Sequence, residues 1–230
     1  MINLNNVAGI TLGIRYSRSF RIPDISGDII DDILYHNSSP FSNDFFVRVQ
    51  EQTNREKILS DTHTKNYLRI NTDDLILGIE INENFEKQFK WINEDILTYF
   101  KERLFKEYQI NNIHRIGIIY HHKVKKVKRL SNLVSDLTSN KIVDATNISI
   151  SFSKKLPTSE ALYRKNVNDY KNTIYEFFET KTSMNANLDY QYYFEPQIQD
   201  LRDCYTESII KGSKDFLKNT YYPIISGYEP

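Results

Sequence analysis

The first periodic segment of the chain alternates apolar and polar positions, as a half-buried strand does. Within ITLGIRYSR, one face is formed by Ile10, Leu12, Ile14 and Tyr16. The next segment, PDISGDIIDDIL, has Pro23 near its start and acidic residues in its first turn, where the helix dipole favours negative charge. The pattern therefore predicts a strand followed by a short helix.

The same pattern recurs later in the chain at a gap-free offset of 104 residues. LGIRY at 12–16 matches IGIIY at 116–120, and DIIDDIL at 28–34 matches NLVSDLT at 132–138. The second match preserves three apolar positions and one acidic position: Ile29/Leu133, Ile30/Val134, Ile33/Leu137 and Asp32/Asp136. Two matches at one offset indicate an internal duplication.

Three strand-like segments and one long helix follow each predicted strand and helix. The strands are expected at 45–50, 66–71 and 74–81 in the first half, and at 147–152, 172–178 and 187–194 in the second. The first closing helix is marked at helical spacing by Phe85, Phe89, Ile92, Ile96, Tyr99, Phe100, Arg103 and Leu104. The second is marked by Leu201, Tyr205, Ile209, Phe216 and Leu217.

A β-α-β-β-β-α unit that occurs twice predicts an α+β fold. Residues 1–112 and 113–230 are expected to be two repeats within one pseudo-symmetric domain. Pairing of the two homologous first strands would give one extended antiparallel sheet with the helices on one face. By analogy of element order alone, the architecture would be a saddle like that of the TATA-binding protein, which does not fix its function.

Composition narrows the class of protein. The chain has 30 Lys and Arg against 30 Asp and Glu, so its overall charge does not indicate a polyanionic partner. Its single cysteine, Cys204, excludes an internal disulfide framework, and no signal-peptide pattern opens the sequence. Apolar runs such as IGIIY are far shorter than the roughly 20 residues of a membrane-spanning helix. We therefore expect a cytoplasmic protein with no membrane contact.

Local charge is uneven, and it marks a candidate binding surface. Residues 113–165 carry 11 basic and 3 acidic side chains, whereas residues 1–112 carry 13 and 17. The candidate surface comprises Arg115, His121, His122, Lys123, Lys125, Lys126, Lys128, Arg129, Lys154 and Lys155, with the two last lysines expected on a nearby strand. It could neutralise nucleic-acid phosphates, contact an acidic protein surface or a second copy, or be an ordinary solvated connection after the strand RIGIIY.

Metal and cofactor sites are not expected. Adjacent strand residues point to opposite faces, so His121 and His122 cannot both bind one ion. His36, His63 and His114 are scattered along the chain, and no P-loop, dinucleotide fingerprint or nucleophile–base motif is present. The sequence therefore favours a protein without enzymatic activity. Dispersed carboxylates and lysines leave a toxin-like RNase as a remote alternative.

One strand is rich in aromatic residues and permits two interpretations. In NLDYQYYFEP, Tyr190, Tyr192 and Phe194 share one face, and Tyr193 lies on the other. Exposed strand aromatics can stack on nucleobases, whereas buried ones pack beneath helices. The neighbouring acids Asp189 and Glu195 weigh against a surface that faces phosphate.

The chain resembles a sporadically distributed family of uncharacterised bacterial proteins. The matching residues are Gly13, Ile14, Arg15 and Tyr16 in the first strand, and Arg115, Ile116, Gly117, Ile118 and Tyr120 in the central strand. The helix from Phe85 to Tyr108 and the closing segment from Asn187 also match. The chain departs from the pattern at Ile119, where the family tends to have Arg, and at His121 and His122. The resemblance implies fold and bacterial origin, and it lends no catalytic residue.

The leading expectation is a non-enzymatic bacterial binding or assembly protein that docks a protein partner or a second copy of itself. An accessory role in a mobile or anti-phage defence locus would fit the sporadic occurrence of the family. The alternative is a nucleic-acid-binding module that uses the basic segment 123–129.

Overall fold

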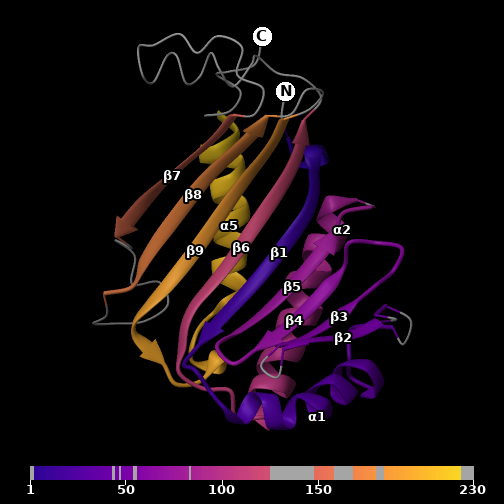
Figure 1. Ribbon diagram of the computed structural model, residues 1–230. Coiled ribbons are helices and arrows are strands. Elements are labelled where there is room, and N and C mark those ends of the chain that lie inside the picture. The colour runs from indigo at the N-terminus through magenta and orange to yellow at the C-terminus, as the bar shows by residue number, and fades with distance from the viewer. Residues whose placement is uncertain are drawn as a thin grey trace.

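The computed structural model describes residues 3–42, 45–46, 48–53, 56–82, 84–124, 148–157, 168–179 and 184–223. Within these residues, nine strands form one antiparallel sheet in the order β2-β3-β4-β5-β1-β6-β9-β8-β7 (Figure 1). The strands are β1 (Val7–Tyr16), β2 (Arg48–Thr53), β3 (Glu56–Ser60), β4 (Tyr67–Asn71), β5 (Asp74–Glu80), β6 (Ile113–Val124), β7 (Ile148–Pro157), β8 (Tyr170–Glu179) and β9 (Met184–Ile198). The expected α+β class is confirmed.

The described helices cover one face of the sheet, and we call the other face the open face (Figure 1). Helix α1 (Arg21–Tyr35) follows β1, and α2 (Phe85–Trp91) follows β5. Helix α2 continues through π-helical turns at Ile92–Ile96 and Phe100–Phe105, with α3 (Leu97–Tyr99) between them. Helix α5 (Thr206–Phe216) continues as π-helical Leu217–Tyr221. No helix among the described residues is long and apolar enough to span a membrane.

Strands β1 and β6 pair at the centre of the sheet and join the two halves of the chain. Gly13 lies opposite Gly117, and on either side of this pair Leu12 faces Ile118 and Ile14 faces Ile116. Alternation along both strands places the apolar residues beneath the helices, where Tyr16 contacts Phe105 edge-on. The remaining positions project from the open face.

The core lies between the sheet and the helices, as the sequence pattern predicts. Phe85 packs against Tyr120 of β6, and Tyr190 of β9 packs against Phe216. The expected division of β9 is confirmed, because its buried aromatics are Tyr190, Tyr192 and Phe194. These side chains pack beneath a helix, which is one of the two interpretations that the sequence permits for this strand.

Two predictions of secondary structure were wrong. Three strands were expected after the first helix, but the structure has four, because Glu56–Ser60 forms β3 between β2 and β4. This strand has only five residues, and Leu59 is its one buried side chain, so it gives no measurable periodicity. The closing helix α5 begins at Thr206, and Tyr205, which was assigned to the buried face, is 63% exposed.

The two histidines of β6 lie within the strand, which corrects the prediction that they belong to an exposed connection. They point to opposite faces, as expected. His122 is buried, with Nδ1 3.1 Å from the Ala186 carbonyl oxygen and Nε2 3.2 Å from the Tyr222 hydroxyl. A carbonyl oxygen only accepts, so Nδ1 carries the proton of the neutral ring, and Nε2 accepts from Tyr222. Burial lowers the pKa of His122 to about 4.

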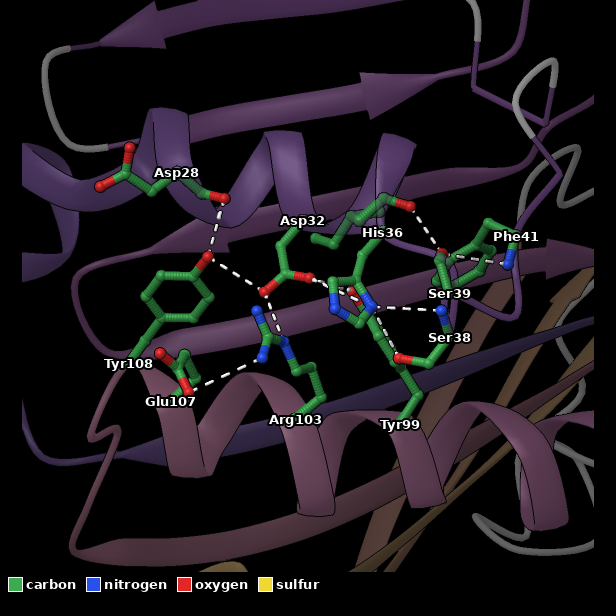
Figure 2. Close-up of polar contacts among 11 residues, drawn as sticks. Asp28, Asp32, His36, Ser38, Ser39, Phe41, Tyr99, Arg103, Glu107 and Tyr108 are labelled. Carbon is green, nitrogen blue, oxygen red and sulfur yellow. Dashed lines mark hydrogen bonds and ion pairs between the residues drawn. The ribbon is translucent and has the colours of Figure 1, made fainter.

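The buried carboxylate of Asp32 fixes α1 to the long helix, which begins as α2 and continues to Phe105 (Figure 2). Arg103 Nε donates to its Oδ2 at 2.9 Å, and the hydroxyl oxygens of Tyr108 and Tyr99 lie 3.1 and 3.4 Å from its two oxygens. Burial and the Asp32 charge raise the pKa of Tyr108 to about 12. Asp32, the acidic position shared by the two predicted repeats, is therefore held by three side chains of the first repeat.

Asp32→Ala should lower the free energy of unfolding by about 3 kcal/mol. This is the lower end of the range for breaking a buried ion pair, because Arg103 remains partly exposed. Urea denaturation would measure the loss. The control is Asp31→Ala, which removes an exposed carboxylate from the same helix and should change stability by less than about 0.5 kcal/mol. Equal effects of the two substitutions would show that the Asp32 contacts do not hold α1.

Acid should destabilise the fold through His122. Its pKa in the folded state lies below the ordinary value of about 6.5, so the unfolded chain binds the extra proton first as the pH falls. The contribution is constant above pH 6.5 and is lost between about pH 6.5 and 4, amounting to about 3 kcal/mol. We expect His122→Gln to have a flatter dependence of unfolding free energy on pH than the parent protein. His63→Gln, which removes an exposed imidazole, should retain the parental slope.

Candidate anion-binding site

A row of charged and aromatic side chains crosses the open face near one end of the central strands. Strand register places Asp74 of β5 opposite Arg15 of β1, Arg15 opposite Arg115 of β6, Arg115 opposite Tyr193 of β9, and Tyr193 opposite Tyr170 of β8. Five adjacent strands thus contribute one side chain each at the same level. The alternation that buries Ile14, Tyr16 and their neighbours on one face directs this row to the other.

The row borders a hollow of about 1000 Å³ on the open face. The lining side chains that matter for its chemistry are Arg15, Arg18, Asp73, Arg115, Tyr170 and Tyr193. Glu195 also lines the hollow, so three guanidinium groups face two carboxylates. His114, another lining residue, adds little positive charge, because burial and the nearby Arg15 lower its pKa. Among the lining side chains alone the arginines exceed the carboxylates by one, and the Asp74 carboxylate opposite Arg15 is bonded to Arg69.

The arginines are only weakly compensated by acidic groups of the protein. Arg15 and Arg18 both approach Oδ2 of Asp73, at 3.7 and 3.9 Å. Among the described residues, no carboxylate lies within ion-pairing distance of Arg115, which instead donates a hydrogen bond of 3.2 Å to the Tyr193 hydroxyl. Arg15 and Arg115 are directly opposite like charges, a cross-strand arrangement that destabilises a sheet. An added anion would relieve this repulsion.

Arg115 and the two tyrosines form a layered arrangement. The rings of Tyr170 and Tyr193 are stacked, with centroids 4.7 Å apart and planes inclined by 7°. The guanidinium carbon of Arg115 lies 5.6 Å from the centroid of Tyr193. Because β9 lies between β6 and β8, Arg115 and Tyr170 approach Tyr193 from opposite sides. The cation is thereby held against an aromatic surface at the rim of the hollow.

A hydrogen-bonded network behind the hollow fixes Tyr193. Its hydroxyl donates to Oε1 of Gln191 at 2.9 Å, and the Asn172 amide donates to the same oxygen at 3.2 Å. Gln191 is buried, and its Nε2 donates to Oδ2 of Asp189 at 2.6 Å. Burial raises the pKa of Asp189. The tyrosine and the arginine bonded to it are therefore oriented before any ligand arrives.

Two paired glycines leave a small part of the open face without side chains. Gly13 and Gly117 are paired, and a methyl group on either would approach other atoms no closer than 3.7 Å. Packing therefore does not require glycine at these positions, in contrast to Gly78, where a methyl group would collide with the Tyr67 ring. A bare backbone in a strand is typical of places where a ligand or another chain approaches closely. This bare strip adjoins the Arg15–Arg115 pair.

The structure describes six of the ten residues of the sequence-predicted basic surface, on β6 and β7. Arg115 lies at the hollow, whereas Lys123 is exposed at the other end of β6, opposite Asn185. Lys154 and Lys155 lie on β7, opposite Thr173 and Asn172 of β8. By strand spacing, these two positions of β7 are about 20 Å from Lys123, so Lys123 itself does not lie beside them. Lys125, Lys126, Lys128 and Arg129 lie outside the described residues.

The rings of His121 and His122 lie on opposite faces of the sheet, so they cannot bind one ion together. His121 lies on the open face, where its ring nitrogens are 2.9 Å from the Thr11 hydroxyl oxygen and 3.1 Å from Asn187 Oδ1. Burial lowers the pKa of His121 as well as that of His122. Within the described ranges, no three His, Cys, Asp or Glu side chains are grouped so that they could hold a metal ion.

Sequence reasoning found Arg115 but missed the rest of the hollow. The signal available for Arg15 was the alternation of β1, which places it on the face opposite to Tyr16, together with the predicted pairing of the two first strands. The same alternation isolates Tyr193 from its buried neighbours. Tyr170 and Arg18 gave no such signal, because their positions depend on the register of β8 and on the chain's path after β1.

No protein-family model matches the chain, and no curated protein matches it.

Proposed function

We propose that this chain is a non-enzymatic binding protein whose open sheet face takes up an anionic group of its partner at Arg15, Arg18 and Arg115. The observation that carries the proposal is the direct cross-strand opposition of Arg15 and Arg115 at the rim of the hollow. Like charges directly opposite each other destabilise a sheet, and the long Arg15–Asp73 contact offsets this only weakly. Arginine presents several donors in a planar fork, which suits the oxygens of phosphate or carboxylate groups.

The weak pairing of the arginines with Asp73 supports the proposal that a bound ligand supplies the counter-charge. Asp73 serves two arginines at distances near 4 Å, and more than half of each arginine side chain is exposed to solvent. Exposed ion pairs of this length contribute about 0–1 kcal/mol, so they do not compensate three cations. A ligand oxygen could enter without breaking a short internal bond. The hollow is therefore available to an anion at little energetic cost.

The architecture of the binding face supports a second, evolutionary proposal. We propose that residues 1–112 and 113–230 arose by duplication, which gave one pseudo-symmetric domain with a saddle-like sheet. Supporting this, the copy of Gly13 at the 104-residue offset is Gly117, the residue that pairs with it. In each half the last strand lies beside the first, since β5 adjoins β1 and β9 adjoins β6. We also propose that the chain is related to the bacterial family that it resembles and that it has an accessory role.

Removing the arginine pair should weaken anion binding without harming the fold. We expect Arg15→Gln/Arg115→Gln to weaken binding of short-chain polyphosphate by at least about tenfold, because each charge-assisted hydrogen bond contributes about 1.5–3 kcal/mol. Calorimetric titration at two salt concentrations would measure this. In the absence of anion the double variant should be no less stable than the parent, because a like-charge pair has been removed.

The matched control is Lys123→Gln, which removes a cation from the far end of β6. It should leave polyphosphate affinity nearly unchanged. If instead Lys123→Gln weakens binding and the arginine pair has no effect, the binding surface is the basic segment expected from the sequence. Absence of polyphosphate binding by the parent protein would contradict the proposal, as would a loss of stability in the arginine variant.

A further inference from the structure

We infer that the hollow binds a nucleoside phosphate, either a free nucleotide or one unit of a single-stranded nucleic acid. This inference rests on the proposed function, because it names the chemical class of the anionic group. The phosphate would accept hydrogen bonds from Arg15 and Arg18, and the base would lie on the Arg115 guanidinium and extend its stack with Tyr193 and Tyr170.

The order of the side chains matches the two ends of a nucleotide. Charge lies at Arg15 and Arg18, and aromatic surface lies at Tyr193 and Tyr170, with Arg115 between them. Neighbouring strands are about 4.8 Å apart, so the charged and aromatic ends are separated by roughly 10–14 Å. A nucleoside phosphate has its negative charge at one end and a flat π-system at the other. Its phosphate can therefore meet the charged end of the row while its base lies on Arg115, which adjoins the aromatic end.

The layering of Arg115 on Tyr193 favours a flat ligand. Bases in single-stranded nucleic acids stack on aromatic rings and on the planes of arginine guanidinium groups. Arg115 is already aligned by its bond to the Tyr193 hydroxyl and by its position near that ring. The side of its guanidinium directed away from Tyr193 is directed toward β1 and Arg15. A base that enters there adds one layer to an existing stack.

Amide groups at the hollow supply hydrogen bonds for a base edge or a sugar hydroxyl. Asn112 lines the hollow in a left-handed backbone conformation, with φ of 58°, and its backbone bonds to Ser17 and Gln199 hold it there. Among the described residues, its side-chain amide has no hydrogen-bond partner. An amide can both donate and accept, which the edges of nucleobases require and an inorganic anion does not.

An acidic protein segment would satisfy only part of this site. Its carboxylates could accept from Arg15 and Arg18, but it offers no planar group for the Arg115–Tyr193 layer unless an aromatic residue follows at the right spacing. The bare strip formed by Gly13 and Gly117 admits a backbone of either kind. The aromatic layer and the amide of Asn112 therefore favour the nucleoside phosphate.

Arg115→Lys should weaken binding of the base while keeping the positive charge that attracts the phosphate. Lysine keeps the positive charge but loses the planar group that stacks. We expect about a tenfold loss of affinity for a fluorescein-labelled ten-nucleotide RNA or for adenosine monophosphate, whichever the parent binds, and little change for short-chain polyphosphate. Tyr193→Leu should have the same selective effect. Tyr35→Leu, which alters an exposed tyrosine on α1, is the matched control and should change neither.

The probes distinguish the failure of this inference from that of the proposed function. The parent should bind the RNA, or adenosine monophosphate, at least about tenfold more tightly than an abasic oligomer, or inorganic phosphate, of equal charge, as base stacking predicts. Equal affinity would overturn the nucleoside assignment and leave the anion site intact. Tighter binding of a poly-glutamate peptide than of RNA would assign the hollow to a protein partner. Absence of binding to all these anions would overturn both proposals. Thermal unfolding of every variant establishes that the fold is retained.

Discussion

The antiparallel pairing of β1 with β6 is the constraint on which the rest of the molecule depends. It joins the two halves of the chain into one sheet, with five strands on one side of the junction and four on the other. Because side chains alternate along a strand, this register also decides which residues face the helices. A slip of one residue would bury Arg15 and expose Ile14 and Tyr16. The buried apolar set therefore stabilises the same register that creates the charged row on the open face.

The interior and the open face differ in how completely their polar groups are compensated. Asp32, deep between α1 and the long helix, has an arginine and two tyrosine hydroxyls around one carboxylate (Figure 2). Arg15, Arg18 and Arg115 share poorer partners, although they lie on the rigid central strands or directly after them. A fold that satisfies a buried charge so fully has no structural need for a weakly compensated cationic cluster at its surface. The contrast supports the proposal that the open face binds a ligand.

The sequence allowed the fold class, the central strands and the inner face of β9 to be predicted, because all of these follow from periodicities of two or 3.6 residues. It could not predict β3, whose five residues include a single buried side chain. Nor could it place His122, whose ring contacts Tyr222, just after the π-helical end of α5 and 100 residues away in the chain. For the site, alternation and the predicted pairing would have brought Arg15 opposite Arg115. The positions of Tyr170 and Asp73 depend on loop paths and strand registers that local pattern does not encode.

The two ends of the central pairing show that its arginines are not a requirement of the sheet. Taking the Gly13–Gly117 pair as a centre, the position two residues along β1 in one direction pairs Arg15 with Arg115, and in the other direction it pairs Thr11 with Ile119. Both pairs belong to the same antiparallel ladder, and both project from the open face. The second pair is uncharged, and Thr11 instead bonds to His121 within the protein. Since the same ladder accommodates a neutral pair at one end, sheet formation does not explain two opposed cations at the other. Their position beside the hollow and its tyrosines explains the two opposed cations if a ligand supplies the negative charge.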